Sequence, residues 1–440
     1  MSRIKSQIVL SSFITAAWLL ALLVSRPVAQ GSATSAVRRF DFGPGAIANG
    51  YTQVLPDMLY GAERGYGFEP GAELKGITRA GKDDLRNDLI TSSQPFYFSV
   101  ALPPGNYRVT VTLGDQAEAT STTVKAELRR LMLERVQTVA GQFATRRFIV
   151  NVRSPQFPGG EVRLKDREKT SEWWAWDEKL TLEFNGEHPA VCALEIAPIE
   201  VPTVYLLGDS TICDQPREPY NSWGQMLPRF FDDRIAIANH AESGESLKSS
   251  LGAKRLDKVL SLIKRGDYLF LQFGHNDQKE KGEGIGAFTS YKADLKKFVL
   301  AARERGAVPV LVTSMHRRTF DTQGKITNSL GDYPEAVRQL VREENVALID
   351  LNAMSKTLYE ALGAEGSGVL FKEGDGTHHS NYGSYELAQC VVEGIKTNKL
   401  DLGKFLLKDL RPFDPARPDA FAQFVVPPSP QQTTVKPLGN

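Results

Sequence analysis

Four short polar segments in the second half of the chain contain the residue types that nucleophilic catalysis requires. A serine nucleophile needs a base to accept its proton, a group to hold that base, and donors for the negative oxygen of a tetrahedral intermediate. The segments are Gly208-Asp209-Ser210-Thr211, the single residue Gly244, Gly274-His275-Asn276-Asp277 and Asp375-Gly376-Thr377-His378. Together they predict a site that cleaves esters through a serine.

Each segment also has an ordinary structural interpretation. Gly, Asp and Ser are common in turns, Asn276 could cap a helix, and Gly244 could be a loop glycine with positive φ. Asp375 lies three residues before His378 and could orient its imidazole, which alone is modest evidence. The combination is more informative, because the serine, the glycine, the amide and the Asp375–His378 pair can all emerge at the same edge of one sheet.

The other acidic and histidine residues near these segments are interpreted as structural or as surface residues. A carboxylate beside the nucleophile, such as Asp209 or Asp277, would oppose the developing negative charge unless it were already hydrogen-bonded. We expect His275, His316 and His379 to support the site from outside it or to lie on the surface.

The sequence that carries these segments alternates between strand and helix from residue 201 onward. Apolar strands are predicted at 204–207, 235–238, 268–271, 308–312 and 346–349, and helices at 223–231, 256–263, 291–305, 333–344 and 382–395. This alternation predicts a parallel sheet with helices on both faces. Ligands bind beyond the carboxyl ends of such strands, where Ser210, Gly244 and Asn276 should emerge. The loop with Asp375 and His378 must fold back to the same edge.

The sequence from about residue 37 to residue 198 is rich in strands and turns. Strands are predicted at 96–102 and 107–113, joined as a hairpin by the turn at 103–106, and further strands at 147–152 and 180–184. The segment 126–136 is compatible with either helix or strand. Several short strands separated by turns predict a β-sandwich.

The four segments, taken together, resemble those of the SGNH (GDSL) hydrolases, and within them those of the rhamnogalacturonan acetylesterases. The likeness covers roughly residues 203–398 and includes two further stretches, Asn239-His240-Ala241-Glu242-Ser243-Gly244-Glu245-Ser246 and Thr377-His378-His379-Ser380-Asn381-Tyr382-Gly383. The N-terminal part resembles, through less specific motifs, the galactose-binding-like sandwich of some bacterial relatives.

The resemblance implies a flavodoxin-like five-stranded parallel sheet and a role for each candidate residue. Ser210 would be the nucleophile, His378 the base and Asp375 the acid that orients it. The oxyanion hole would consist of the backbone NH groups of Ser210 and Gly244 together with the Asn276 side chain.

We therefore expect four parts: a signal peptide at 1–31, a β-sandwich at 35–200, a hydrolase domain at 201–400 and an extended tail at 401–440. The expected function is removal of O-acetyl groups from a plant cell-wall polysaccharide, most readily rhamnogalacturonan, without a cofactor. Two alternatives are a general esterase or lipase of the GDSL type, and a carbohydrate-binding protein with an inert hydrolase fold.

The N-terminus has the layout of a secretory signal. Arg3 and Lys5 precede an apolar run at 8–24, and small residues follow at 27–33. An uncleaved membrane anchor is the alternative, because the run approaches the ~18 to 20 residues that span a bilayer. We expect a secreted or periplasmic protein without a stable membrane partner after cleavage.

The charge balance and the cysteine count limit the partners and cross-links. The chain has 53 Lys and Arg against 52 Asp and Glu, so no net field favours nucleic acid, and an acetylated polysaccharide is the expected partner. The cysteines Cys192, Cys213 and Cys390 allow at most one internal disulfide, whose pairing stays open. No metal-ligand spacing is visible.

Two further groups of residues could contact a sugar chain. Tryptophans in the segment 173–176 could stack on sugar rings, although core or interface packing is commoner. Cationic side chains near the expected rim would suit an acidic polysaccharide, or could simply be solvated: Arg217, Lys248, Arg317 and Arg318.

Overall fold

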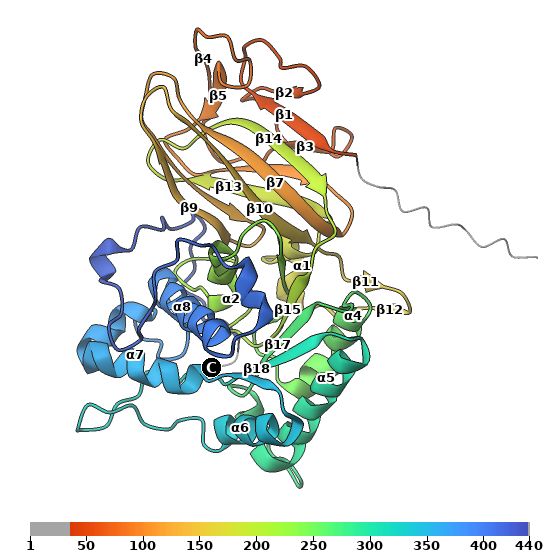
Figure 1. Cartoon of the computed structure of the whole chain (residues 1–440), viewed down its shortest axis with the longest axis vertical. Coiled ribbons are helices and arrows are strands. Elements are labelled where there is room, and N and C mark those ends of the chain that lie inside the picture. The colour runs from red at the N-terminus through yellow and green to blue at the C-terminus, as the bar shows by residue number, and fades with distance from the viewer. Residues whose placement is uncertain (1–35, 439–440) are drawn as a thin grey trace, which may run out of the picture. The chain divides into compact units, whose positions relative to one another are not determined.

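The first half of the chain forms a β-sandwich, drawn in red to yellow-green in Figure 1. The computed structural model describes residues 36–438, so the predicted signal segment lies outside the described residues. One sheet contains, in spatial order, β10 (Phe143–Val152), β7 (Gly105–Gly114), β14 (Ala190–Pro198), β1 (Arg38–Phe42) and β2 (Thr52–Val54), with β5 (Asp88–Thr91) pairing both β14 and β4 (Lys75–Thr78). The other contains β3 (Tyr66–Phe68), β6 (Phe96–Ala101), β13 (Lys179–Asn185), β8 (Thr120–Ala126) and β9 (Arg130–Thr138).

The predicted hairpin between residues 96–102 and 107–113 is wrong, although both strands exist. β6 pairs with β3 and β13, whereas β7 pairs with β10 and β14 in the opposite sheet. The turn therefore carries the chain from one sheet to the other, and the Tyr107 hydroxyl donates to the Pro103 carbonyl oxygen at this corner (2.8 Å). Alternating apolar residues show that a strand has a buried face, but not which strand lies beside it.

The core of the sandwich explains why these segments become strands. Alternate side chains of β7, Val109, Val111 and Leu113, are fully buried and join a cluster with phenylalanines from β1 and β6. The open segment 126–136 is strand: β8 ends at Ala126, a turn with positive φ at Glu127 and Arg129 follows, and β9 begins at Arg130.

Short elements lie between β10 and β13. They are β11 (Gln156–Phe157), β12 (Gly160–Glu161), the four-residue helix α1 (Asp166–Lys169) and the 3₁₀ helix η1 (Trp173–Ala175). Their apolar side chains form a small cluster of their own around Leu128 and Trp176.

A five-stranded parallel sheet forms the centre of the second half, as predicted. Its spatial order is β16 (Ala236–Asn239), β15 (Thr203–Gly208), β17 (Tyr268–Gln272), β18 (Val308–Val312) and β19 (Ala347–Ile349). This is the flavodoxin-like order 2-1-3-4-5. The order reverses between β15 and β17, the two strands that Ser210 and Asn276 follow.

Helices cover both faces of this sheet because each strand is apolar on both sides. Val204 and Leu206 of β15 pack into one cluster, and Tyr205 and Leu207 into the other. The first face is covered by α2 (Trp223–Met226), α7 (Leu351–Gly366) and α8 (Asn381–Thr397), and the second by α3 (Leu247–Gly252), α4 (Arg255–Leu260), α5 (Lys292–Glu304) and α6 (Tyr333–Glu344). Figure 1 shows α7 and α8 on one side of β17 and β18, and α4 and α5 on the other.

Several helical segments differ from the sequence prediction. The helix expected at 223–231 is α2 followed by the 3₁₀ helix η2 (Leu227–Phe230), and the π-helix η4 (Ala287–Tyr291) precedes α5. α3 and α7 were not predicted. Further 3₁₀ helices are η3 (Asp277–Lys279), η5 (Ser367–Leu370), η6 (Asp401–Phe405) and η7 (Phe421–Gln423).

The segment after residue 400 lies along both halves of the chain. Phe405 packs in the hydrolase core, and the buried Ser429 hydroxyl donates to Glu183 of β13 (2.7 Å to Oε2). Thr433 NH donates to the Glu218 carbonyl oxygen (2.8 Å), so the tail is fixed before its last described residues.

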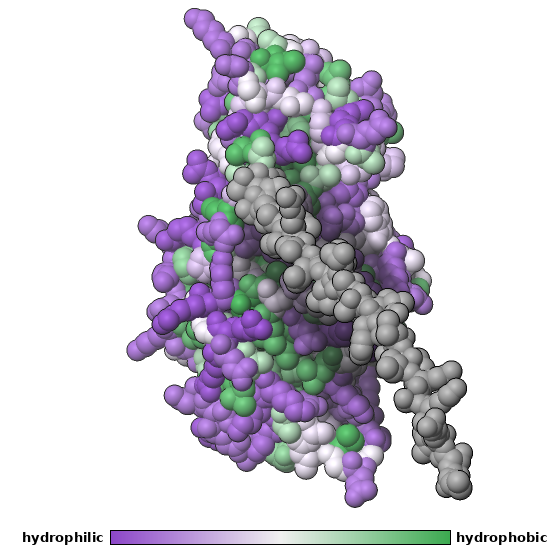
Figure 2. All heavy atoms as spheres, turned by 90° about the vertical axis from the view of Figure 1, so that its right-hand side faces the viewer, coloured by the Kyte–Doolittle hydropathy of each residue, from purple (hydrophilic) through white to green (hydrophobic). Residues whose placement is uncertain are grey.

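Hydrophilic residues cover most of the face that Figure 2 shows. The large hydrophobic residues that are exposed in the described chain come from separate elements, and three of them, Phe421, Val435 and Leu438, belong to the tail. Among residues 36–438, no helix combines the length and hydrophobicity that crossing a membrane requires.

Candidate active site

Ser210 lies in the turn that follows β15. Asp209 shapes this turn by accepting hydrogen bonds from Thr211 NH (3.0 Å) and the Thr211 hydroxyl (2.7 Å). Gly208 is required at the end of the strand, because a Cβ there would stand 2.4 Å from the Gln272 carbonyl oxygen of β17. The tight approach of β15 to β17 therefore places the serine at the carboxyl edge of the sheet, where it is only 1% exposed.

Ser210, His378 and Asp375 form a continuous series of hydrogen bonds. His378 Nε2 lies 2.9 Å from Ser210 Oγ, and His378 Nδ1 lies 2.9 Å from Asp375 Oδ2. A carboxylate can only accept, so Nδ1 carries the proton and Nε2 is left to accept the serine hydroxyl proton. The loop before α8 thus reaches the edge where β15 ends, as the sequence predicted.

The hydrogen bonds around Asp375 favour its ionised form. Burial alone would raise its pKa, but hydrogen bonds from His378 Nδ1 and from the NH groups of Thr377 (2.8 Å) and His378 (3.1 Å) outweigh burial and lower the pKa. A charged carboxylate at this position holds the imidazole and stabilises the imidazolium that forms when the base accepts a proton.

Gly244 and Asn276, the other two predicted donors, lie in segments that are tied to each other. Gly244 has φ +77°, and the Asn276 amide donates to the carbonyl oxygen of the next residue, Glu245 (3.0 Å). An amide has two hydrogens, so Asn276 keeps a second donor.

Two residues that the sequence analysis did not single out complete the surroundings of the serine. The Gln215 amide donates to the Ser210 carbonyl oxygen (2.7 Å) and to the Ser243 hydroxyl (3.2 Å), which links the turn of Ser210 to the loop of Gly244. The ring of Tyr220 meets the ring of His378 edge to face, with centroids 5.9 Å apart. Neither residue belongs to a recognisable motif.

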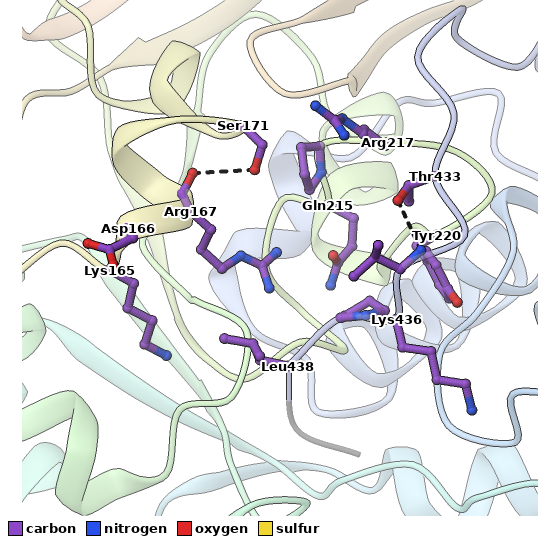
Figure 3. Close-up of a pocket in the computed structure, with 13 residues that line it drawn as sticks. Lys165, Asp166, Arg167, Ser171, Gln215, Arg217, Tyr220, Thr433, Lys436 and Leu438 are labelled. Atoms are coloured by element: carbon purple, nitrogen blue, oxygen red, sulfur yellow. Dashed lines mark hydrogen bonds between the residues drawn. The ribbon is translucent and has the colours of Figure 1, made fainter.

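A cavity of about 520 Å³ lies beside this group (Figure 3). Gln215 and Tyr220 line it next to the serine and histidine, and Leu438 of the tail lines it where it approaches Gly244. Four cationic side chains from three parts of the chain line the cavity, beside Asp166 and apolar residues of the tail: Lys165, Arg167, Arg217 and Lys436.

The cations predicted at the rim have different positions. Arg217 is exposed and lines the cavity, whereas Lys248 is exposed on α3. Arg318 binds Ser367 and Ala364, and Arg317 binds backbone oxygens of His275 and Ser329. The last two therefore hold loops in place.

The predicted structural acids are buried and hydrogen-bonded. Asp209 lies 3.4 Å from His275 Nδ1, and although burial opposes its charge, His275 and Thr211 lower its pKa. Burial lowers the pKa of His275 despite this carboxylate, so Asp209 is a carboxylate that lies beside a neutral imidazole. Burial raises the pKa of Asp277 to about 7, and its Oδ1 accepts from Leu247 NH at the start of α3.

The remaining histidines lie outside the series of hydrogen bonds. His379, next to His378, is buried, bonds the Tyr359 hydroxyl (2.7 Å) and packs on Phe371. His316 is buried, its backbone NH donates to the Ser355 hydroxyl (3.0 Å), and burial lowers its pKa to about 4.

The tryptophan segment divides into buried and exposed members. Trp176 is buried and donates to Glu168 (3.1 Å), whereas Trp173 is 42% exposed with the Lys179 ammonium 4.3 Å from its ring centroid. The three cysteines are buried and free. Within the described part of the chain, no cluster of three His, Cys, Asp or Glu side chains could hold a metal ion.

A serine, a histidine and an aspartate in series at the carboxyl edge of a parallel sheet are the arrangement of a serine hydrolase. Residues 206–383 match the GDSL-like Lipase/Acylhydrolase family, and residues 38–158 match the Beta-agarase/YXIM esterase-like, galactose-binding domain-like family.

Relatives of known sequence agree with both matches. The chain is 41% identical over 219 residues to rhamnogalacturonan acetylesterase RhgT of Bacillus subtilis, covering 46% of this chain and 94% of that protein. It is 30% identical over 371 residues to the uncharacterized esterase YxiM of the same organism, covering 82% of this chain and 91% of that protein. The crystal structure of YxiM aligns over 83% of this chain and 99% of that one, with 26% identity and a TM-score of 0.45. The chain belongs to the GDSL (SGNH) hydrolase family and is a carboxylic ester hydrolase.

Proposed function

We propose that this protein removes O-acetyl groups from a plant cell-wall polysaccharide, most readily rhamnogalacturonan, with Ser210 as nucleophile. The observation that carries the proposal is the Ser210–His378–Asp375 series, with 2.9 Å at each step. The similarity to a rhamnogalacturonan acetylesterase over most of that relative's length supports the substrate.

In the proposed reaction, Ser210 Oγ attacks the acetyl carbonyl carbon while His378 Nε2 accepts the hydroxyl proton. The NH groups of Ser210 and Gly244 and the Asn276 amide stabilise the oxyanion. His378 then returns the proton to the departing sugar hydroxyl, which leaves an acetyl-enzyme. A water molecule, deprotonated by the same imidazole, releases acetate and restores the serine.

The charge of the cavity supports a polysaccharide that contains acidic sugars. Arg217 and Lys436 line the cavity, are exposed, and have no acidic partner among the described residues; Lys436 donates to the Gly374 carbonyl oxygen. Lys165 and Arg167 are paired with glutamates, but they also line the cavity. Apolar side chains of the tail, Val435, Pro437 and Leu438, also line the cavity. A lipase would use such a surface for its acyl chain, since each buried methylene contributes ~0.8 kcal/mol, so the acyl-length preference separates the two functions.

The proposed activity is tested by measuring acetate release from acetylated pectic, xylan and chitin polymers, and from aryl esters of increasing acyl length. We expect the largest release from pectin rich in rhamnogalacturonan, and poor turnover beyond about four acyl carbons because an apolar acyl site is not expected. A preference for long acyl chains would indicate the lipase alternative, and no ester hydrolysis would indicate the binding-protein alternative. The Ser210→Ala variant is the control for contaminating esterases.

We also propose that the protein is exported, on the basis of the N-terminal sequence pattern. The mature N-terminus of protein recovered outside the cytoplasm would then begin near residue 31. Recovery of the full-length chain in a membrane fraction would favour the uncleaved anchor.

A further inference from the structure

One lysine from the N-terminal half contacts both neighbours of Gly244. The ammonium of Lys165, the residue directly before α1, donates to the Ser243 carbonyl oxygen (2.6 Å) and lies 2.8 Å from Glu245 Oε1. Nζ also lies 3.7 Å from the position that a Cβ would have on Gly244. In Figure 3 the Lys165 side chain extends from the residue before α1 in the direction of Leu438.

The hydrogen bond to Ser243 matters because of peptide geometry. The Ser243 carbonyl and the Gly244 NH belong to one planar trans peptide, in which the two groups point in opposite directions. Fixing the carbonyl therefore fixes the direction of the NH. A cation on the oxygen also polarises the peptide, which makes its NH a stronger donor.

The contact with Glu245 extends the same effect to Asn276. The Asn276 amide donates to the Glu245 carbonyl oxygen (3.0 Å), so the residue that Lys165 binds by its carboxylate also orients the side-chain donor. Lys165 thereby contacts the segment through which two of the three proposed oxyanion donors are held.

Lys165 is itself held by a buried network. Its backbone NH donates to Glu168 Oε2 (2.8 Å). Glu168 also accepts hydrogen bonds from both terminal nitrogens of Arg255 (3.0 and 2.6 Å). Arg255 Nε lies 3.5 Å from Glu245 Oε1, which closes a ring of charged groups. Glu168, Arg255 and Glu245 are each about 1% exposed, whereas the Lys165 side chain is 29% exposed.

We propose that Lys165 is a positioning residue for the oxyanion hole and acts through the Ser243–Gly244 peptide. The inference rests on the proposed function, because Gly244 NH is assigned there as an oxyanion donor. It gives the N-terminal half a part in the chemical step, separate from any binding of sugar by the sandwich.

The test compares three variants with the parent protein in steady-state hydrolysis of a soluble aryl acetate. Lys165→Met removes the ammonium and keeps a stem of similar length, and Lys165→Arg keeps the charge and its donors. Lys169→Met changes an exposed lysine in α1, the short helix that follows Lys165, and is the matched control. We expect Lys165→Met to lower kcat about tenfold with KM within about twofold, Lys165→Arg to recover most of the loss, and Lys169→Met to match the parent.

Several results would overturn the inference. The first is an unchanged kcat in Lys165→Met, and the second is a rise in its KM alone. The third is a loss of kcat no larger than the loss of folded protein that thermal unfolding shows for this variant. An inactive parent protein would overturn the proposed function itself, whereas an active parent with an unaffected Lys165→Met would remove only the role of this lysine.

Discussion

Replacing Asn276 by Ala tests the proposed oxyanion hole at its side-chain donor. One oxyanion donor typically contributes 10²–10³-fold to kcat, or about 2.7–4 kcal/mol. Asn276 also donates to the Glu245 carbonyl oxygen, beside Gly244, so its removal leaves that carbonyl without this donor and loosens a second part of the site. We therefore expect a loss near the upper end, about 10³-fold in kcat.

KM should change little in Asn276→Ala, because the interaction strengthens only as negative charge develops on the oxygen. Asn276→Asp should be at least as damaging, since a carboxylate cannot donate and would repel the oxyanion. Asn328→Ala is the matched control, because among the described residues this exposed asparagine bonds within its own loop only, to the Gly331 carbonyl oxygen and from Leu330 NH.

The assay is steady-state hydrolysis of an aryl acetate, with thermal unfolding of each variant to establish that it is folded. A kcat within about threefold of the parent would refute the role of Asn276 as a donor, given the magnitude expected for one such interaction. A rise in KM with unchanged kcat would identify Asn276 as a substrate-binding residue instead.

Four further perturbations test neighbouring parts of the site. Ser210→Ala should lower kcat at least ~10³-fold in a folded protein, and near-parental activity would refute the nucleophile. Asp375→Asn should lower kcat on the order of 10⁴-fold by favouring the wrong imidazole tautomer. Because the folded-state pKa of Asp375 is lowered, its contribution to stability is present at neutral pH and is lost as acid protonates the carboxylate, so the variant should unfold at lower temperature at pH 7. His379→Ala should reduce the unfolding temperature more than kcat, because this ring packs against buried aromatic residues; the opposite result would move the base by one residue. The pKa of Asp277 is raised to about 7, so between pH ~3.9 and 7 the folded state holds a proton that the unfolded state has released. The stability of the protein therefore falls as pH rises through this window. Asp277→Asn should lessen that fall, measured as the difference in unfolding temperature between pH 5 and pH 8.

The parallel sheet could be predicted because its strands are apolar on both faces and are separated by helical segments. The carboxyl-edge rule then placed Ser210, Gly244 and Asn276 correctly relative to the strands they follow. The spacing of Asp375 and His378 predicted that the carboxylate could orient the imidazole, and in the structure the two side chains are hydrogen-bonded to each other.

The remaining features depend on contacts between distant parts of the chain. The two strands on either side of residues 103–106 do not pair with each other, because each pairs with strands of a different sheet. The alternation of apolar and polar residues alone does not specify which strands pair. Lys165 and Gln215 have no motif, and their importance comes from where their nitrogen atoms lie. The glutamates and the arginine around Lys165 are residue types that are rarely buried, so their burial is informative once the structure is known. No local sequence pattern shows which of them pair with each other.

Buried charges join the sandwich to the hydrolase half and explain why a site in one half can depend on the other. Arg129, in the turn before β9, lies 2.5 Å from Glu218, and Arg130 lies 3.2 Å from Asp214; all four side chains are at most 5% exposed. Removing one partner of such a pair leaves an uncompensated buried charge, at a cost of about 3–5 kcal/mol. Glu218 and Asp214 follow Ser210 within the same loop, so removing the sandwich would take away the two arginines that hold this loop in place. The sandwich therefore maintains the environment in which Ser210 and Gly244 are held, whatever it contributes to recognising a sugar.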